Sequence, residues 1–486
     1  MALQDNRTSV TFTQDADYPR KIPFHPAKPF PEYRGKVLDP TNPVYGAVRD
    51  LLRQLELDRE NYGTPAWNPL GSIIQPGMTV FIKPNTVLHT NLSGDSPLAV
   101  VVHASVLRPL LDYTCLALRG EGRIIIGDSQ LIESHFDEAL DVSQVGPLVQ
   151  WYRQKTAIPL ECLDLRSCRS VRTWLYGKWG RVPVQQDPRG YTFVNLGENS
   201  YFRDIDPKKL RIAIASHKVM FDHHSGGRHE YLFPNSFLES DVILNVAKLK
   251  THRRTAITLA LKNFMGLPAL KDTLPHFMVG SPEEGGDQYI HPSRRKRIGT
   301  WMHDLIQTTP NIPLKFVTAI AKRLLWNSHY IWPFQDDVYE AMWPGNDTLW
   351  RTLLDLNRIA LYADKKGVLQ DRPQRGYLSL IDGIIGGEGD GPLSPGAVQS
   401  RTLLAGFNPV ALDYVAATLM GFDPDKIPLI RKGVEDTPHT SPLFWGSPSD
   451  IQVVDPTGNA SLADYATRVN LHYKAHPSWA GHAERP

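Results

Sequence analysis

Short apolar runs alternate with helical patterns along most of the chain. The runs contain many β-branched residues and are apolar at successive positions, which is typical of strands covered on both faces. Helical patterns lie between them, as in residues 409–421, where Asn408 is a natural N-cap and Pro409 fits the first turn. This order predicts an α/β fold, a mostly parallel sheet with helices on both faces. The predicted strands are residues 78–85, 123–129, 210–216, 241–250, 377–383 and 402–407.

Pattern and composition also divide the chain into parts. The N-terminal part is rich in proline and contains one expected helix, residues 44–57. A later part breaks the strand and helix rhythm with prolines and helical patches such as LKFVTAIAKRLLW, and we expect it to be a lid or an interaction surface. The predicted parts are an N-terminal extension (1–70), the first part of the core (71–268), a largely helical insertion (269–350), the second part of the core (351–450) and a C-terminal tail (451–486).

Polar side chains occupy the ends of the predicted strands. The run DVILNVAKLKTH begins as an apolar strand but ends with cations and a histidine. In open α/β sheets, ligands bind beyond the carboxyl ends of the strands, so these side chains are candidates for a site. The candidate substrate-binding residues are Lys83, Asn85, Asp128, Asn245, Lys248, Lys262, Asn263 and Asp382.

Charges near a dry interior need partners, and two kinds of partner are available. In one interpretation, lysines and carboxylates of neighbouring strands pair with one another as a structural network. In the other, the lysines, asparagines and His252 receive a phosphate or carboxylate. We favour the second, because many polar groups converge on one edge. His252 is then the candidate for proton transfer, and Lys250 binds the anion or acts as a base with a depressed pKa.

An acidic, glycine-rich loop, DGIIGGEGDG, begins at the end of the predicted strand 377–383. Its glycines would let the backbone approach a ligand closely. Glu388 and Asp390 offer oxygen ligands two residues apart, which suit Mg²⁺ or another divalent cation better than they suit zinc. A solvated acidic turn is the alternative interpretation.

Four motifs, in this order, resemble the domain-of-unknown-function family numbered 362. They are VFIKPN, then IIIGDS, then DVILNVAKLKTH with ALKNFMGL, and finally LIDGIIGGEGDGP with NPVALDYVAATLMGF. The resemblance covers residues 79–422, is weakest in the insertion, and implies a shared ligand pocket. Many family members carry a ferredoxin-like appendage with iron–sulfur clusters. Because Cys115, Cys162 and Cys168 cannot supply one four-cysteine site, no iron–sulfur cluster is expected here.

Charge and apolar pattern narrow the class of protein. A formal net charge of +2 is too small for a nucleic-acid coat, and the one basic run, residues 294–297, reads as a solvated loop or an anion patch. We expect no signal peptide and no membrane partner, since no long apolar segment occurs. Three cysteines without metal-ligand spacing favour free thiols in the cytoplasm.

A second group of titratable residues lies in FDHHSGGRHEY, which contains Asp222, His223, His224 and His229. A metal site, a catalytic histidine and ordinary loop histidines are all compatible with this segment.

Two functions fit these observations. The first is a cytoplasmic enzyme that acts on a small anionic metabolite, with the cation held by Glu388 and Asp390 if one is used. The second is a non-catalytic binding or accessory protein that uses the same pocket. In either case the insertion is a candidate surface for a protein partner or for self-association.

Overall fold

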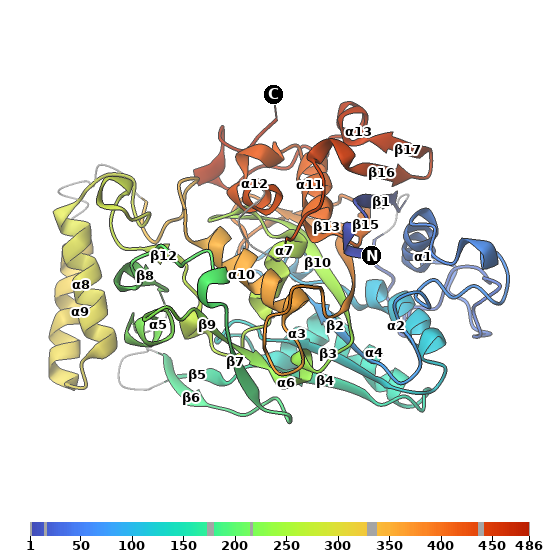
Figure 1. Cartoon of the computed structure of the whole chain (residues 1–486), viewed down its shortest axis with the longest axis horizontal. Helices are drawn as coiled ribbons and strands as arrows, with labels where there is room; N and C mark the ends of the chain where they lie inside the picture. The colour runs from blue at the N-terminus through green and yellow to red at the C-terminus, as the bar shows by residue number, and fades with distance from the viewer. Residues whose placement is uncertain are drawn as a thin grey trace.

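The core is a mixed sheet whose parallel half carries the predicted strand ends. The computed structural model describes residues 2–13, 17–172, 179–213, 217–327, 338–435 and 442–485. Within them an eleven-stranded sheet has the order β17-β16-β1-β15-β13-β10-β2-β3-β4, with β11 attached to β10 and β14 to β13 (Figure 1). The α/β fold class is confirmed. The parallel block consists of β13 (Gly376–Glu388), β10 (Val242–His252), β2 (Thr79–Pro84), β3 (Arg123–Asp128) and β4 (Leu160–Asp164).

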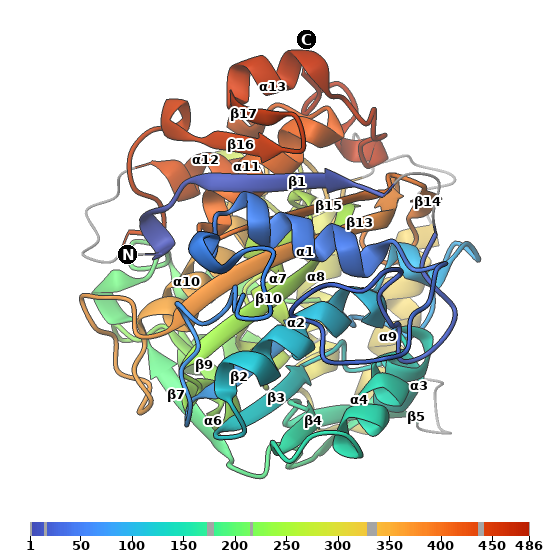
Figure 2. The same cartoon turned by 90° about the vertical axis from the view of Figure 1, so that its right-hand side faces the viewer.

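Helices cover both faces of this sheet, as predicted. Alternate residues of β10 enter two separate cores: Ile243 and Ala247 join one, while Leu244 and Val246 join the other. The first core includes residues of α7 (Leu259–Asn263), α10 (Leu349–Tyr362) and α11 (Pro409–Met420). The second includes residues of α1 (Val44–Gln54), α2 (Ala104–Leu118) and α4 (Val145–Arg153). Figure 2 shows α1 and α2 in front of the strands.

The predicted N-terminal extension and the predicted C-terminal tail both contribute strands to the main sheet. Strand β1 (Arg7–Phe12) pairs antiparallel with β15 (Thr402–Gly406) and parallel with β16 (Gln452–Asp455). Strand β17 (Gly458–Ser461) completes this edge. The segment RTSVTF was missed because its polar residues alternate with few apolar ones, although Thr8, Ser9 and Val10 are all buried.

The prediction of a core strand over residues 210–216 is wrong. Only Leu210–Arg211 (β8) is a strand, and it pairs with β12 (Phe277–Met278) in a separate two-stranded sheet. Residues 214–216 lie outside the described part of the chain. The apolar side chains of Leu210 and Ile212 are buried without joining the main ladder, where β2 and β13 already occupy both sides of β10.

The insertion is dominated by a helical hairpin, α8 (Arg294–Thr308) and α9 (Ile312–Asn327), at the left of Figure 1. The basic run 294–297 forms the first turn of α8 and is not a loop, because Ser293 caps the helix by accepting a hydrogen bond from the Lys296 backbone N–H. Part of the insertion, residues 328–337, falls outside the described residues. No described helix is both long and apolar enough to cross a bilayer.

Candidate functional site

A cavity of about 150 Å³ opens where β2, β3 and β10 end. This volume equals roughly five water molecules at liquid density, so it suits a small ligand. Seven of the predicted residues line it: Lys83, Asn85, Asp128, Lys250, His252, Lys262 and Asn263. Asn245, Lys248, Asp382, Glu388 and Asp390 are not among the lining residues.

An ion pair between neighbouring strands forms the floor of the cavity. The Lys83 ammonium lies 2.8 Å from Asp128 Oδ1, and both side chains are buried. The other oxygen of Asp128 accepts hydrogen bonds from the backbone N–H and the hydroxyl of Thr86. Gly266 packs directly on the pair, since a Cβ atom there would lie 2.3 Å from Asp128 Oδ1. This close approach explains the glycine that ends ALKNFMG.

The short helix α7 presents two further predicted residues. Asn263 donates to the carbonyl oxygen of Lys83 and, at 2.7 Å, to Oδ1 of Asn245. Asn245 is therefore a buried support for Asn263 and does not contact the cavity. Residues 256–257 form β11, and α7 begins at Leu259.

Asp413, which the sequence analysis did not identify, holds α7 in place. Its carboxylate oxygens accept the backbone N–H groups of Ala260 (2.7 Å) and Leu261 (2.9 Å), which have no partner inside the helix. Burial raises the pKa of Asp413 to about 8. The residue comes from the motif NPVALDYVAATLMGF, whose function in the site is to cap the helix that carries Lys262.

The end of β10 brings Lys250 and His252 to the cavity wall. The Lys250 ammonium donates to the carbonyl oxygen of Val100 at 2.8 Å, and no carboxylate of a described residue pairs with it. Burial lowers its pKa well below the ordinary value, and the Lys262 and Lys248 charges add to this shift. Nδ1 of His252 accepts the Arg254 backbone N–H, so the neutral ring carries its proton on Nε2. Burial keeps the pKa of His252 well below 6.5, so the ring is neutral at pH 7.

Cations outnumber carboxylates around the cavity. Asp128 is the one acidic residue in the described lining, whereas six lysines and arginines line it. Lys262 forms no ion pair and no side-chain hydrogen bond within the described residues, and burial together with Arg254 and Arg253 lowers its pKa to about 7. The lining cations are Lys83, Lys250, Arg253, Arg254, Lys262 and Lys271.

Several of these lining residues were not predicted. Arg253 and Arg254 directly follow His252 in KLKTHRRT, so the basic character of that segment was a usable signal. Lys271 and His276 come from a stretch assigned to the insertion, and nothing in its local pattern indicated a role. Burial lowers the pKa of Lys271 to about 7 and that of His276 to about 3.

Four buried polar atoms of lining residues form no hydrogen bond in the described structure. They are the Thr258 hydroxyl, Oδ1 of Asn85, Nε of Arg253 and Oδ1 of Asp128, the last of which has its ion pair with Lys83. Buried polar groups usually have partners, so these atoms are available to a ligand or to solvent.

Lys248 and Asp382 pair with each other, as in the interpretation that lysines and carboxylates of neighbouring strands form a structural network. Their side chains are fully buried and form an ion pair of 3.0 Å. The Tyr18 hydroxyl donates to Asp382 Oδ1 at 2.6 Å and accepts from Lys248 at 2.8 Å. The two lysines of β10 differ because the register with β13 shifts between them. That bulge separates a paired lysine from a lysine at the cavity.

The two acidic residues proposed for a cation lie elsewhere. Glu388 is the last residue of β13, and its carboxylate accepts the Lys474 backbone N–H at 2.9 Å. Asp390 lies 3.2 Å from His476. Both contacts bind the loop to the C-terminal segment. The neighbouring glycines also serve packing within the chain, since a Cβ atom at Gly386 would collide with the Tyr473 hydroxyl group.

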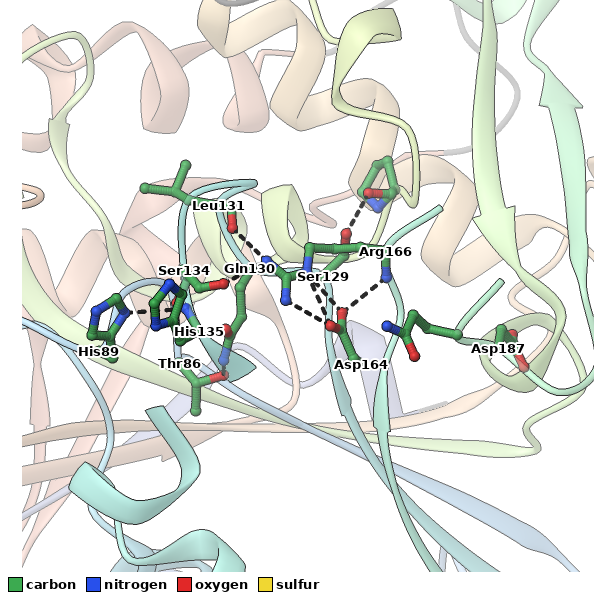
Figure 3. A network of polar contacts seen from close by, with 12 residues as sticks. Thr86, His89, Ser129, Gln130, Leu131, Ser134, His135, Asp164, Arg166 and Asp187 are labelled. Atoms are coloured by element: carbon green, nitrogen blue, oxygen red, sulfur yellow. Dashed lines mark hydrogen bonds and ion pairs between the residues drawn. The ribbon is translucent and has the colours of Figure 1, made fainter. Parts of the chain in front are cut away.

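A polar network fixes the loop after β3, which supplies Ser129 and Leu131 to the cavity (Figure 3). The buried Arg166 donates to the carbonyl oxygens of Leu131 (2.9 Å) and Ser134 (2.8 Å). Its guanidinium also binds both oxygens of Asp164. The wall of the cavity is therefore held rigidly on this side.

His89, His135 and Glu138 lie beside this loop, with one potential ligand atom from each within 4.8 Å of the others. His89 Nδ1 accepts the His135 backbone N–H, which leaves the proton of a neutral ring on Nε2, facing Glu138 at 3.5 Å. Both ring nitrogens of His89 are thus engaged, and the group is a hydrogen-bonded cluster.

The histidines of FDHHSGGRHEY lie away from the cavity. His224 and His229 are buried with their Nδ1 atoms 3.3 Å apart, and His224 Nε2 donates to the Thr273 carbonyl oxygen. His223 instead contacts Glu230 at 3.0 Å. Burial lowers the pKa of His224 to about 3 and that of His229 to about 4, so both rings are neutral and structural.

Fold and cavity together define an α/β protein with a small cationic crevice at the carboxyl ends of parallel strands. Residues 198–418 match the model of the family described as "Domain of unknown function (DUF362)", which confirms the suspected family over that range. The motifs VFIKPN and IIIGDS precede the matched range, although both supply cavity residues. Searches of curated proteins and of solved structures gave no match.

Proposed function

We propose that this chain is an enzyme that binds a small phosphate or carboxylate in the cavity. The observation that supports the proposal is the excess of basic over acidic side chains in the lining, where Lys83 pairs with Asp128 and Arg254 pairs with Glu340 but Lys250 and Lys262 have no carboxylate partner within the described residues. An uncompensated buried charge is strongly unfavourable, and an anionic ligand removes that cost. The Thr258 hydroxyl would donate an uncharged hydrogen bond to the same ligand.

The proposed chemistry is proton transfer. Lys262 is suited to be the base, because an amine with a pKa near 7 is partly unprotonated at neutral pH. His252 is better suited to donate a hydrogen bond from Nε2 than to accept a proton, since its Nδ1 is already engaged. Lys250 would bind the negatively charged group of the ligand. These roles modify the expectation that His252 transfers the proton.

A non-catalytic binding protein is the second candidate, and the same cavity would serve it. The Lys262 amine, which has no partner within the described residues, favours the interpretation as an enzyme. A protein that only binds an anion does not require a lysine whose pKa lies near 7. A divalent cation remains part of the proposal only as a group supplied with the substrate, since Glu388 and Asp390 contact the C-terminal segment. A cytoplasmic location is also proposed, because Cys115, Cys162 and Cys168 are free thiols.

The anion site is tested by binding of inorganic phosphate and of small carboxylates, measured by isothermal titration calorimetry. We expect Lys262→Met to weaken binding about tenfold, which corresponds to roughly 1.4 kcal/mol. Lys155→Met is the matched control, since Lys155 is an exposed lysine outside the cavity. Equal affinities in wild type and Lys262→Met would refute the site.

A further inference from the structure

The helical hairpin of α8 and α9 exposes large apolar side chains on both helices. On α9, Val317, Ile320 and Leu324 are 62%, 45% and 65% exposed. Their spacing of three and four residues places them on one face of the helix. Trp301 on α8 is 61% exposed. Monomeric proteins rarely expose an apolar patch of this kind without a function for it.

The hairpin is also strongly basic compared with the rest of the molecule. Residues 294–327 contain seven of the 53 lysines and arginines but one of the 51 aspartates and glutamates. The hairpin therefore has a formal charge of +6, and the remaining 46 basic and 50 acidic residues give −4. Its single acid, Asp304, pairs with Arg211 of the body at 3.0 Å. Lys296 is buried and Arg297 pairs with Glu284 at 3.1 Å, whereas Arg294 and Arg323 are exposed, so the surface of the hairpin presents basic and apolar side chains together.

This combination argues against a second copy of the chain as the occupant. Two copies meeting through their hairpins would bring two basic surfaces together, which is unfavourable. It also argues against nucleic acid, because the exposed face of α9 presents valine, isoleucine and leucine where a phosphate backbone would need cations. Whatever binds the exposed surface of the hairpin must be apolar in its interior and anionic at its surface.

We propose that the α8–α9 hairpin docks the protein on an anionic lipid bilayer, lying in the interface without spanning it. The apolar face formed by Val317, Ile320 and Leu324 would enter the boundary between headgroups and acyl chains. Trp301 suits the headgroup level, where amphipathic rings are enriched. Arg294 and other basic residues at the start of α8 would contact the anionic headgroups.

The position of the hairpin fits this role. It lies at one end of the molecule, apart from the main sheet and its covering helices (Figure 1). Gln288 donates to the Thr300 hydroxyl at 2.9 Å, and Asp304 binds Arg211, so α8 is anchored to the body on its inner side. Docking would therefore leave the sheet and cavity clear of the bilayer. This inference extends the expectation of a partner surface in the insertion and replaces the expectation that membranes are excluded.

Vesicle flotation with the full-length chain tests the proposal. We expect flotation with vesicles of equal parts phosphatidylcholine and phosphatidylserine, weaker flotation with phosphatidylcholine alone, and release at high salt. The variant Val317→Ser/Ile320→Ser/Leu324→Ser should lose about tenfold or more of this binding. Val368→Ser is the matched control, because Val368 is 57% exposed and lies outside the hairpin.

Several outcomes would overturn the proposal. The first is a wild type that does not float, and the second is a triple variant that floats as well as wild type. A second copy of the chain would be the partner if the wild type does not float but sediments as a dimer, and the triple variant sediments as a monomer. If the triple variant fails to fold, Arg294→Glu/Arg323→Glu must instead abolish the preference for phosphatidylserine. Phosphate binding by calorimetry is independent, so a failure here leaves the anion site unaffected.

Discussion

Lys262 shows how one side chain acquires unusual chemistry from its position. A lysine ordinarily stays charged at neutral pH, but burial and the nearby Arg254 and Arg253 lower the pKa of Lys262 to about 7. A neighbouring lysine, Lys271, reaches a similar pKa chiefly through burial. The cavity therefore changes its total charge within the physiological pH range.

This titration predicts a pH dependence of anion binding. Carboxylate probes keep a constant charge above about pH 6, so any change reports on the protein. As pH rises from 6 to 9, Lys262 and Lys271 lose protons and the affinity should fall, by at most about tenfold per pH unit for each titrating group. A bound anion favours the charged amine, so the fall extends above pH 7. Calorimetry across this range should show a smaller fall in Lys262→Met, and an affinity that rises with pH would contradict the assignment.

At the scale of elements, α7 depends on a cap from another part of the chain. The helix spans five residues, too few to be stable by itself, and its first N–H groups are satisfied by Asp413 of α11. The position of Lys262 and Asn263 is thus set by a residue about 150 positions away.

Asp413→Ala should affect both stability and binding. The change leaves two buried N–H groups without a partner, and we expect the free energy of unfolding to fall by about 1–3 kcal/mol. Anion affinity should also fall, because α7 carries Lys262. Chemical denaturation and calorimetry measure the two effects, with Asp371→Ala as the exposed control. Unchanged affinity in a less stable Asp413→Ala protein would show that the cap does not position the site.

Elements also show how far sequence reasoning reached. Lys83, Lys250 and His252 were predictable, because apolar strands that end in polar residues carry a strong pattern. Glu388 was misplaced, because β13 continues beyond Asp382 and carries the acidic residues towards the C-terminal segment. The difference between Lys248 and Lys250 depends on a register shift with β13, which no local pattern encodes.

Other parts of the site depend on contacts between distant segments. Lys271 and His276 reach the cavity from an irregular stretch whose path is determined by tertiary packing. In the sequence, Asp413 is one polar residue in an apolar helix. Its function as the cap of α7 is visible only when the position of α7 is known. The parallel core was predictable from strand and helix periodicity, whereas β1 was hidden by its threonines and serine.

At the scale of the whole molecule, the N-terminal strand belongs to the core. Val10 is fully buried, whereas Phe12 on the same strand is 38% exposed. We expect Val10→Ala to lower the free energy of unfolding by about 2 kcal/mol, because it leaves a cavity in a packed interior. Phe12→Ala is the matched control and should cost less than about 1 kcal/mol. Guanidinium chloride unfolding distinguishes them, and equal losses would place β1 outside the core.

The placement of β1 between β15 and β16 has a consequence for biosynthesis. Residues 7–12 leave the ribosome long before their neighbours in the sheet, because both neighbours come from beyond residue 401. At translation rates of about 5–20 residues per second, the strand waits roughly 20–80 s for its first partner. During that interval its unpaired edge is available to other nascent chains, so folding in the cell should depend on chaperones that shield β1.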